Sequence, residues 1–306
     1  MTAHDSTRNR DVTETTTPAE PTTRTLTVPG ATLTYDVRAG AAVGDAPLFL
    51  IGSPMGAAGF GTLASHFADR TVVTYDPRGV ERSTKADPGS PSAPAQHADD
   101  LHRLIAALGS GPVDVFASSG GAVNALVLVA TYPEDVRVLV AHEPPIADIL
   151  PDRDAALAAS RAVHETYLRD GYGAAMARFI SLVMHRGPFP DDWADQPAPD
   201  PAMFGLPTED DGSRDDPLLG QNMTSGTHHQ HDFDVVRAAS TRVVIAVGAE
   251  SDGELAHRAA VAAAERLGSQ PVVFPSNHGG FLGGEYGQTG EPAAFATKLR
   301  QVLAES

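Results

Sequence analysis

The chain has 306 residues, with 39 acidic and 22 basic side chains, a formal net charge of −17 and no cysteine. Without cysteine there is no disulfide framework, no cysteine-ligated metal site and no thiol nucleophile. The negative charge argues against nucleic acid and anionic membranes as partners, because both need a basic surface.

The N-terminal stretch, residues 1–23, is polar and offers almost nothing that a core could bury. We therefore predict a disordered tail there. The stretch has no apolar segment like that of a secretory signal, and its acidic residues do not fit a transit peptide. No run approaches the roughly 18 consecutive apolar residues of a membrane helix. These features predict a cytoplasmic protein that does not engage a membrane.

Strand and helix signals alternate along most of the chain. Short apolar runs predict buried strands, and apolar residues spaced by three and four predict helices. This alternation is typical of an α/β fold, in which helices cover both faces of a mostly parallel central sheet. The predicted strands are 25–28, 32–37, 47–51, 71–75, 113–117, 136–141, 242–247 and 271–274; the predicted helices are 95–108, 122–132, 254–267 and 292–303.

The alternation stops between about residues 146 and 239. Helical patterns at 154–167 and 173–184 are followed by a stretch rich in proline, aspartate and glycine, which prevents long regular elements. We therefore expect a core domain formed by residues 24–145 and 240–306, with residues 146–239 inserted as a helical cap. We refer to residues 146–239 as the insertion.

The segment around Ser119 is the most informative in the chain. The predicted strand 113–117 leads into a turn of two serines and two glycines, and a helix follows at once. A sharp strand–turn–helix strains its central residue and demands small neighbours, which Ala117 and Gly121 supply. Such a turn exposes the Ser119 hydroxyl and directs the Gly120 amide toward a developing negative charge. The alternative is a glycine-rich turn that only packs or that cradles a phosphate.

The turn resembles the nucleophile elbow of the α/β-hydrolase fold, G-x-S-x-G, with Ala117 replacing the first glycine. Two other segments support the resemblance, which covers about residues 25–145 and 240–305. Residues 50–55 stand where the family carries an oxyanion loop, and residues 75–83 resemble its D-x-R-G-x-G-x-S loop, with Glu81 in place of a glycine. In the second loop we expect Arg78 to pair locally and Gly79 to form a turn.

The resemblance also implies roles for several of these residues. Ser119 would be the nucleophile, and the backbone amides of Ser53 and Gly120 would form the oxyanion hole, with Met55 as the less favoured second donor. The catalytic base would be a histidine after the last strand. His278 is in that position, in a glycine-flanked loop.

The acid of the triad is left open between three carboxylates. The family usually places it after the strand 242–247, where this chain has Ser251 flanked by Glu250 and Asp252. Some members take it from the end of the preceding strand, where this chain has Glu143. A carboxylate buried there needs a partner, which an imidazolium would provide. We favour Glu143, then Asp252, then Glu250.

The insertion contains a histidine-rich segment around His228, followed by Asp232 and Asp234. Its spacing is weak evidence for a metal site, and we expect neither a metal nor a cofactor. The segment returns the insertion to the core and borders the expected pocket. We therefore expect His228 and Met55 to contact substrate.

These patterns predict a serine hydrolase that acts on a small ester, lactone or similar acyl substrate through an acyl-enzyme. The alternatives are a cofactor-free perhydrolase, haloperoxidase-like enzyme or acyl transferase with the same triad, or a ligand-binding protein with a vestigial site. A homodimer is left open. The acidic insertion, if it borders the entrance, would disfavour anionic substrates, so we expect a neutral or cationic one. The acidic residues concerned are Asp191, Asp192, Asp195, Asp200, Glu209, Asp210, Asp211, Asp215 and Asp216.

Overall fold

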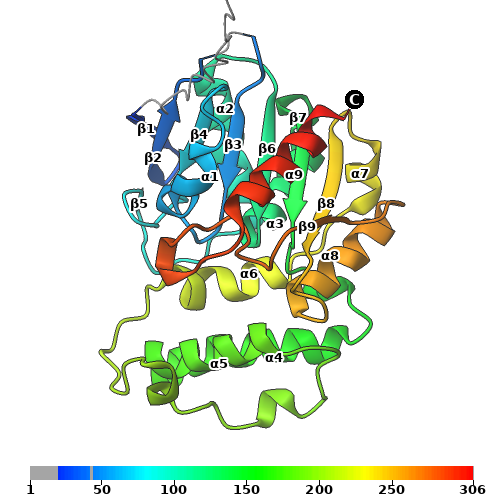
Figure 1. Cartoon of the computed structure of the whole chain (residues 1–306). Helices are drawn as coiled ribbons and strands as arrows, with labels where there is room; N and C mark the ends of the chain where they lie inside the picture. The colour runs from blue at the N-terminus through cyan, green and yellow to red at the C-terminus, as the bar shows by residue number, and fades with distance from the viewer. Residues whose placement is uncertain (1–19, 42–43, 306) are drawn as a thin grey trace, which may run out of the picture.

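A computed structural model describes residues 20–41 and 44–305, and its centre is a nine-stranded sheet (Figure 1). The strand order is β1-β2-β4-β3-β6-β7-β8-β9, and β5 pairs with β2. All pairs from β4 to β9 are parallel, whereas β2 is antiparallel to β1, β4 and β5. The strands are β1 Thr22–Val28, β2 Ala31–Arg38, β3 Leu48–Ile51, β4 Val72–Tyr75, β5 Thr84–Lys85, β6 Val113–Ser118, β7 Val136–His142, β8 Arg242–Gly248 and β9 Val272–Phe274.

The mostly parallel α/β architecture predicted from the sequence is confirmed. Two details of the sheet differ from the expectation. Thr22 and Thr23 already pair with β2, so the sheet begins inside the predicted tail, whose residues 1–19 lie outside the described residues. The two-residue strand β5 was not predicted, because it is too short to carry a pattern.

Helices cover both faces of the sheet, as the alternation predicts. On one face α2, α3 and α8 bury apolar residues against the strands, and on the other α1 and α9 do so (Figure 1). α2 ends where Gly109 adopts a left-handed conformation (φ 66°), a common way to terminate a helix. These helices are α1 Gly61–Ser65, α2 Pro94–Leu108, α3 Gly120–Thr131, α8 Leu255–Arg266 and α9 Pro292–Ala304.

The insertion between β7 and β8 builds a separate layer at one end of the sheet. α4 (Arg153–Asp170) and α5 (Tyr172–Met184) lie side by side there, and α6 (Met223–Thr227) lies between them and the core (Figure 1). The layer has its own apolar cluster, which includes Leu157, Tyr167 and Leu219. α7 (Phe233–Ala238) then returns the chain to the sheet.

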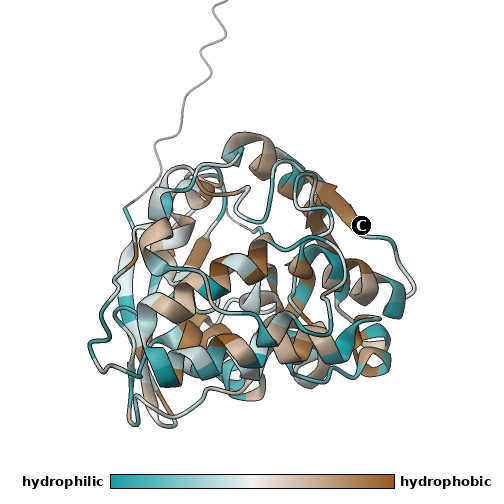
Figure 2. Cartoon of the chain, turned by 90° about the horizontal axis from the view of Figure 1, so that it is seen from below, coloured by the Kyte–Doolittle hydropathy of each residue, from teal (hydrophilic) through white to brown (hydrophobic). Residues whose placement is uncertain are grey.

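Seen from below, the helices carry both hydrophilic and hydrophobic residues, as expected for helices that bury only one face (Figure 2). Within the described residues, no helix combines the length and the apolar character needed to cross a bilayer.

Candidate active site

Ser119 lies at the turn between β6 and α3, as the sequence predicts. Its backbone has φ 57° and ψ −129°, a conformation that is uncommon for a residue other than glycine. The neighbouring positions leave no room for larger residues: a Cβ atom on Gly121 would lie 2.7 Å from the Ile51 carbonyl oxygen. The amide of Ser119 donates to the carbonyl of His142 on β7 (2.9 Å), which fixes the turn against the next strand. Strain of this kind is characteristic of functional sites.

Gly120 and Ser53 lie against each other beside Ser119. A Cβ atom on Gly120 would be 2.5 Å from the Ser53 carbonyl oxygen, so only glycine allows this approach. Neither backbone amide donates to an acceptor in the described part of the chain. The two residues line the same cavity as Ser119. Their amides are therefore available for an oxyanion.

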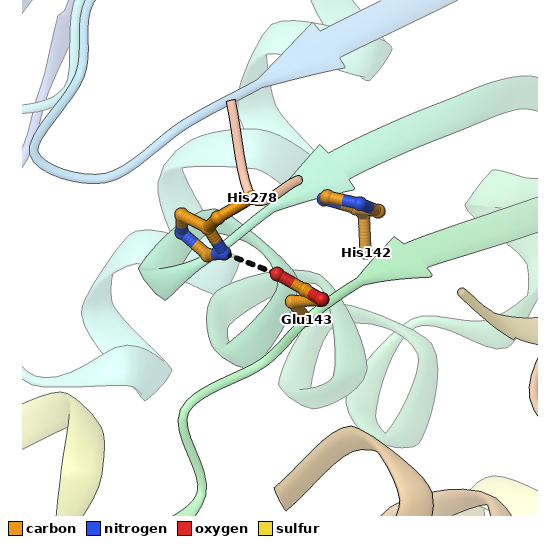
Figure 3. Close-up of side chains that lie close together, drawn as sticks. All are labelled: His142, Glu143 and His278. Atoms are coloured by element: carbon orange, nitrogen blue, oxygen red, sulfur yellow. Dashed lines mark hydrogen bonds and ion pairs between the residues drawn. The ribbon is translucent and has the colours of Figure 1, made fainter. Parts of the chain in front are cut away.

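His278 and Glu143 form the central contact of the site (Figure 3). The Nδ1 atom of His278, in the loop after β9, lies 2.6 Å from Oε2 of Glu143, the residue immediately after β7. The carboxylate is fully buried, whereas the histidine side chain is 39% exposed. Because a carboxylate only accepts, Nδ1 carries the proton and Nε2 is left free to accept one.

The other oxygen of Glu143 is held from β8 and the loop after it. The Gly248 amide donates to Oε1 (2.8 Å), and the Ser251 hydroxyl donates to the same atom. Glu143 itself has φ 48°, another strained backbone conformation. Ser251 thus occupies the position where the family usually has its acid. Its hydroxyl donates to Glu143, the carboxylate that follows the preceding strand.

A second histidine also approaches this carboxylate. Nδ1 of His257, on α8, lies 3.7 Å from Oε1 of Glu143, and its Nε2 lies 3.6 Å from Oδ1 of Asp252. His257 could not be predicted from the sequence as part of the site, because nothing in the local pattern of α8 distinguishes it from other helix residues. It adds a potential positive charge beside the buried carboxylate.

The charges in the cluster stabilise one another. Burial acts to raise the pKa of Glu143, but His257 and His278 outweigh it, and the pKa is held far below its usual range. Burial acts to lower the pKa of His278, but the Glu143 carboxylate outweighs it, and the net pKa lies above 6.5. Glu143 is therefore ionised at neutral pH.

The other two candidate acids do not contact His278. Asp252 has an 89% exposed side chain, and its carboxylate lies 3.6 Å from His257. Glu250 accepts a hydrogen bond from the Ser276 hydroxyl (3.3 Å). Of the three carboxylates considered, Glu143 alone reaches the histidine.

Ser119 and His278 face a shared cavity of about 380 Å³. No hydrogen bond of 3.5 Å or less joins their side chains in the residues that the structure covers. Catalytic hydrogen bonds of this type are often long in the absence of substrate.

Two residues that we expected to contact substrate are not among the residues lining this cavity or the smaller one beside Ser53. Met55 packs where Gly52 and Gly59 leave space for its side chain. His228 follows α6, and burial lowers its pKa. Met223 and Thr227 of α6, the helix just before His228, line both cavities.

The acidic residues of the insertion also lie elsewhere. None of the nine lines either cavity at Ser119, and four of them line a separate hollow. The carboxylate in the larger cavity is Glu254 instead.

The partner of Arg78 lies farther along the chain than the local pairing that we expected. It forms a bidentate ion pair with Asp100 on α2 (2.6 and 2.7 Å), and both side chains are buried. Gly79, with φ 72°, forms the expected turn. Glu81 adopts φ 47°, the conformation that explains a glycine in the corresponding family position.

Within the described residues, one cluster has donor atoms close enough together for a metal ion: His142, Glu143 and His278. Both oxygens of Glu143 already accept hydrogen bonds. His142 lies in an aromatic environment formed by Phe116, Phe274 and Phe295, where burial lowers its pKa to about 4. The oxygens of Glu143 are therefore engaged in hydrogen bonds and are not free ligand atoms.

The strained serine, the buried carboxylate and the histidine follow three parallel strands of the sheet, β6, β7 and β9. The model of the alpha/beta hydrolase fold family matches residues 48–205. The chain is 31% identical over 274 residues to the uncharacterized hydrolase YraK of Bacillus subtilis (strain 168), covering 84% of this chain and 89% of YraK. The chain therefore belongs to the α/β-hydrolase fold family, and hydrolase is the activity class that these matches support.

Solved structures share the fold at low sequence identity. A thermophilic esterase from Thermogutta terrifontis superimposes with a TM-score of 0.64 at 19% identity, covering 93% of this chain and 98% of the esterase. A hydrolase from Pseudomonas aeruginosa PA01 gives 0.64 at 18% identity, with coverage of 92% and 98%.

Proposed function

We propose that the protein is a serine hydrolase of small esters, lactones or similar acyl compounds, with Ser119, His278 and Glu143 as its catalytic triad. The observation that carries this proposal is the 2.6 Å contact between His278 Nδ1 and Glu143 Oε2, made beside a cavity that Ser119 shares with His278. An orienting carboxylate leaves Nε2 of the histidine free to face the nucleophile. The esterase among the solved structures is consistent with this activity class.

In the proposed reaction, His278 Nε2 takes the proton of the Ser119 hydroxyl as Oγ attacks the carbonyl carbon. Glu143 holds the imidazole in the required tautomer and stabilises the imidazolium that forms. The amides of Ser53 and Gly120 bind the oxyanion, a contribution worth about 10²–10³ in rate per donor. The C–O bond then breaks, and His278 gives the proton to the leaving alcohol.

A water molecule completes the cycle. His278 takes its proton while the oxygen attacks the acyl-enzyme, and the Ser119–acyl bond breaks with return of the proton to Oγ. The products are a carboxylic acid and an alcohol, and the proposed reaction consumes no cofactor.

We also propose that the substrate is neutral or cationic. The described residues that line the two cavities include no lysine or arginine, and Glu254 places a carboxylate in the larger one. Burial raises the pKa of Glu254. The guanidinium of Arg186, whose Nη2 lies 3.0 Å from Oε1 of Glu254, acts to lower this pKa. This local carboxylate replaces the acidic insertion as the reason to disfavour anionic substrates.

A fluorophosphonate probe tests the nucleophile directly. Wild-type protein should be labelled, and Ser119→Ala should lose the label together with turnover of p-nitrophenyl acetate. Ser118→Ala, one residue away, is the matched control and should keep both. A wild-type protein that is neither labelled nor active would refute the enzyme proposal and favour a ligand-binding protein.

A further inference from the structure

Two cavities meet at Ser119, and they differ greatly in size. The smaller has a volume of about 60 Å³, and the larger about 380 Å³. Pro145, Met223 and Thr227 line both and so lie between them. A substrate bound at the serine therefore has two directions in which to extend.

The proposed catalytic groups are divided between the two cavities. Ser53 and Gly120, the proposed oxyanion donors, line the smaller cavity and not the larger. His278 lines the larger cavity and not the smaller. The two sides of Ser119 are therefore not equivalent for the reaction.

This division sets the orientation of an ester. In the tetrahedral intermediate the oxyanion points to its amide donors, and the leaving oxygen must lie near the histidine that protonates it. The leaving alcohol is then on the side of the larger cavity, and the acyl chain, a separate substituent of the tetrahedral carbon, is left the smaller one. We propose, on the basis of the proposed function, that the substrates are esters of a short acyl group with a larger, apolar alcohol.

The volumes agree with this assignment. The smaller cavity has about one sixth of the volume of the larger, about 60 Å³ against about 380 Å³. The polar residues Ser92, Asn124, Asn222 and Ser225 are part of its wall. The shorter part of an ester is therefore expected in the smaller cavity, and the longer part in the larger one.

The wall of the larger cavity is suited to an apolar alcohol. Phe179, Leu182, Val183 and Met184 of α5 line it, together with Leu255 of α8. Val183 is 38% and Met184 67% exposed, so apolar side chains also continue to the surface at this cavity. The apolar wall would bind an alkyl or aryl group by removing it from water.

The test compares two isomeric esters, octyl acetate and methyl nonanoate, which have the same composition and differ only in the position of the ester bond. We expect kcat/KM for octyl acetate to exceed that for methyl nonanoate by at least about tenfold, since even one misplaced methylene can cost about that factor in a pocket that does not fit it. Equal rates, or faster hydrolysis of methyl nonanoate, would overturn the orientation while leaving the serine hydrolase intact. Absence of both turnover and fluorophosphonate labelling would instead overturn the proposed function, and the orientation with it.

Two variants locate the effect in the cavities. Val183→Trp narrows the larger cavity and should raise KM for octyl acetate several-fold relative to methyl acetate. Val235→Trp on α7, where the side chain is 44% exposed and lines neither cavity, is its matched control.

Leu218→Ala enlarges the smaller cavity and should raise the rate of methyl nonanoate hydrolysis relative to that of octyl acetate. Leu267→Ala, outside both cavities, should leave the ratio of the two rates unchanged. An unchanged ratio in both cavity variants would overturn the proposal.

Discussion

His278 and Glu143 lie 2.6 Å apart, although Glu143 follows β7 and not β8, the strand after which the family usually places its acid. Ser251 stands in that usual position, and its hydroxyl donates to the Glu143 carboxylate. Compared with the usual family arrangement, the carboxylate therefore follows β7 instead of β8. The residue at the usual acid position, Ser251, donates a hydrogen bond to this carboxylate.

Removing this carboxylate should disable the enzyme. In Glu143→Gln we expect kcat for p-nitrophenyl acetate to fall by about 10³–10⁴, because the amide no longer holds the tautomer or stabilises the imidazolium. Asp252→Asn and Glu250→Gln, matched controls that do not contact His278, should stay within a few-fold of wild type. A collapse confined to Asp252→Asn would assign the acid to that residue instead.

The pH dependence follows from the same contact. The base must be neutral to take the Ser119 proton, and the carboxylate raises the pKa of His278 above 6.5. The rate constant kcat/KM should therefore rise with pH through a midpoint above 6.5. Glu143→Gln removes the raising charge, so the residual activity should rise at a lower pH. A pH–rate profile of both proteins checks this, and a midpoint that does not move would contradict it.

Ser251 should contribute to stability through the buried carboxylate. Its side chain is fully buried, and Ser251→Ala removes one of the donors to Glu143. Hydrogen bonds to charged groups are worth about 1.5–3 kcal/mol, and we expect a loss of that size in the free energy of unfolding measured with urea. Ser65→Ala, at an exposed position of α1, is the control. A loss below about 0.5 kcal/mol would show that the Gly248 amide and the histidines suffice to hold the carboxylate.

Gly120 should tolerate no side chain. In Gly120→Ala the new Cβ would be placed 2.5 Å from the Ser53 carbonyl oxygen and would push the proposed oxyanion donors apart. We expect kcat to fall by about 10² or more. Gly89→Ala, where the nearest atom would be 4.0 Å away, should be neutral and serves as the control. Normal kinetics in Gly120→Ala would count against these amides as the oxyanion hole.

The buried pair of Arg78 and Asp100 should be essential for stability. Asp100→Asn leaves the buried Arg78 guanidinium without its anion, which typically costs about 3–5 kcal/mol. The loss is measured by urea unfolding. Asp99→Asn on the same helix removes the exposed pair with Arg103 and should change the unfolding midpoint far less. Equal effects of the two variants would rule out burial as the cause.

Much of the fold and part of the site could be predicted from the sequence. The alternation of apolar strands and amphipathic helices is a local pattern, because each element must bury its own apolar side, and it predicted the α/β architecture. The turn at Ser119 could be predicted for a similar reason, since its backbone conformation demands small residues close by in the sequence. His278 was predictable from its place after the last strand.

Tertiary structure decided the rest, because it depends on which distant segments meet. The pattern left Glu143, Asp252 and Glu250 open, and it is the packing of β7 against β8 that brings Glu143 to His278 and to Ser251. The approach of His257 and the division of space around Ser119 likewise depend on side chains from helices far apart in the chain. A residue's neighbours in sequence specify its backbone, whereas the partners of a buried charge and the walls of a cavity exist only once the elements have packed.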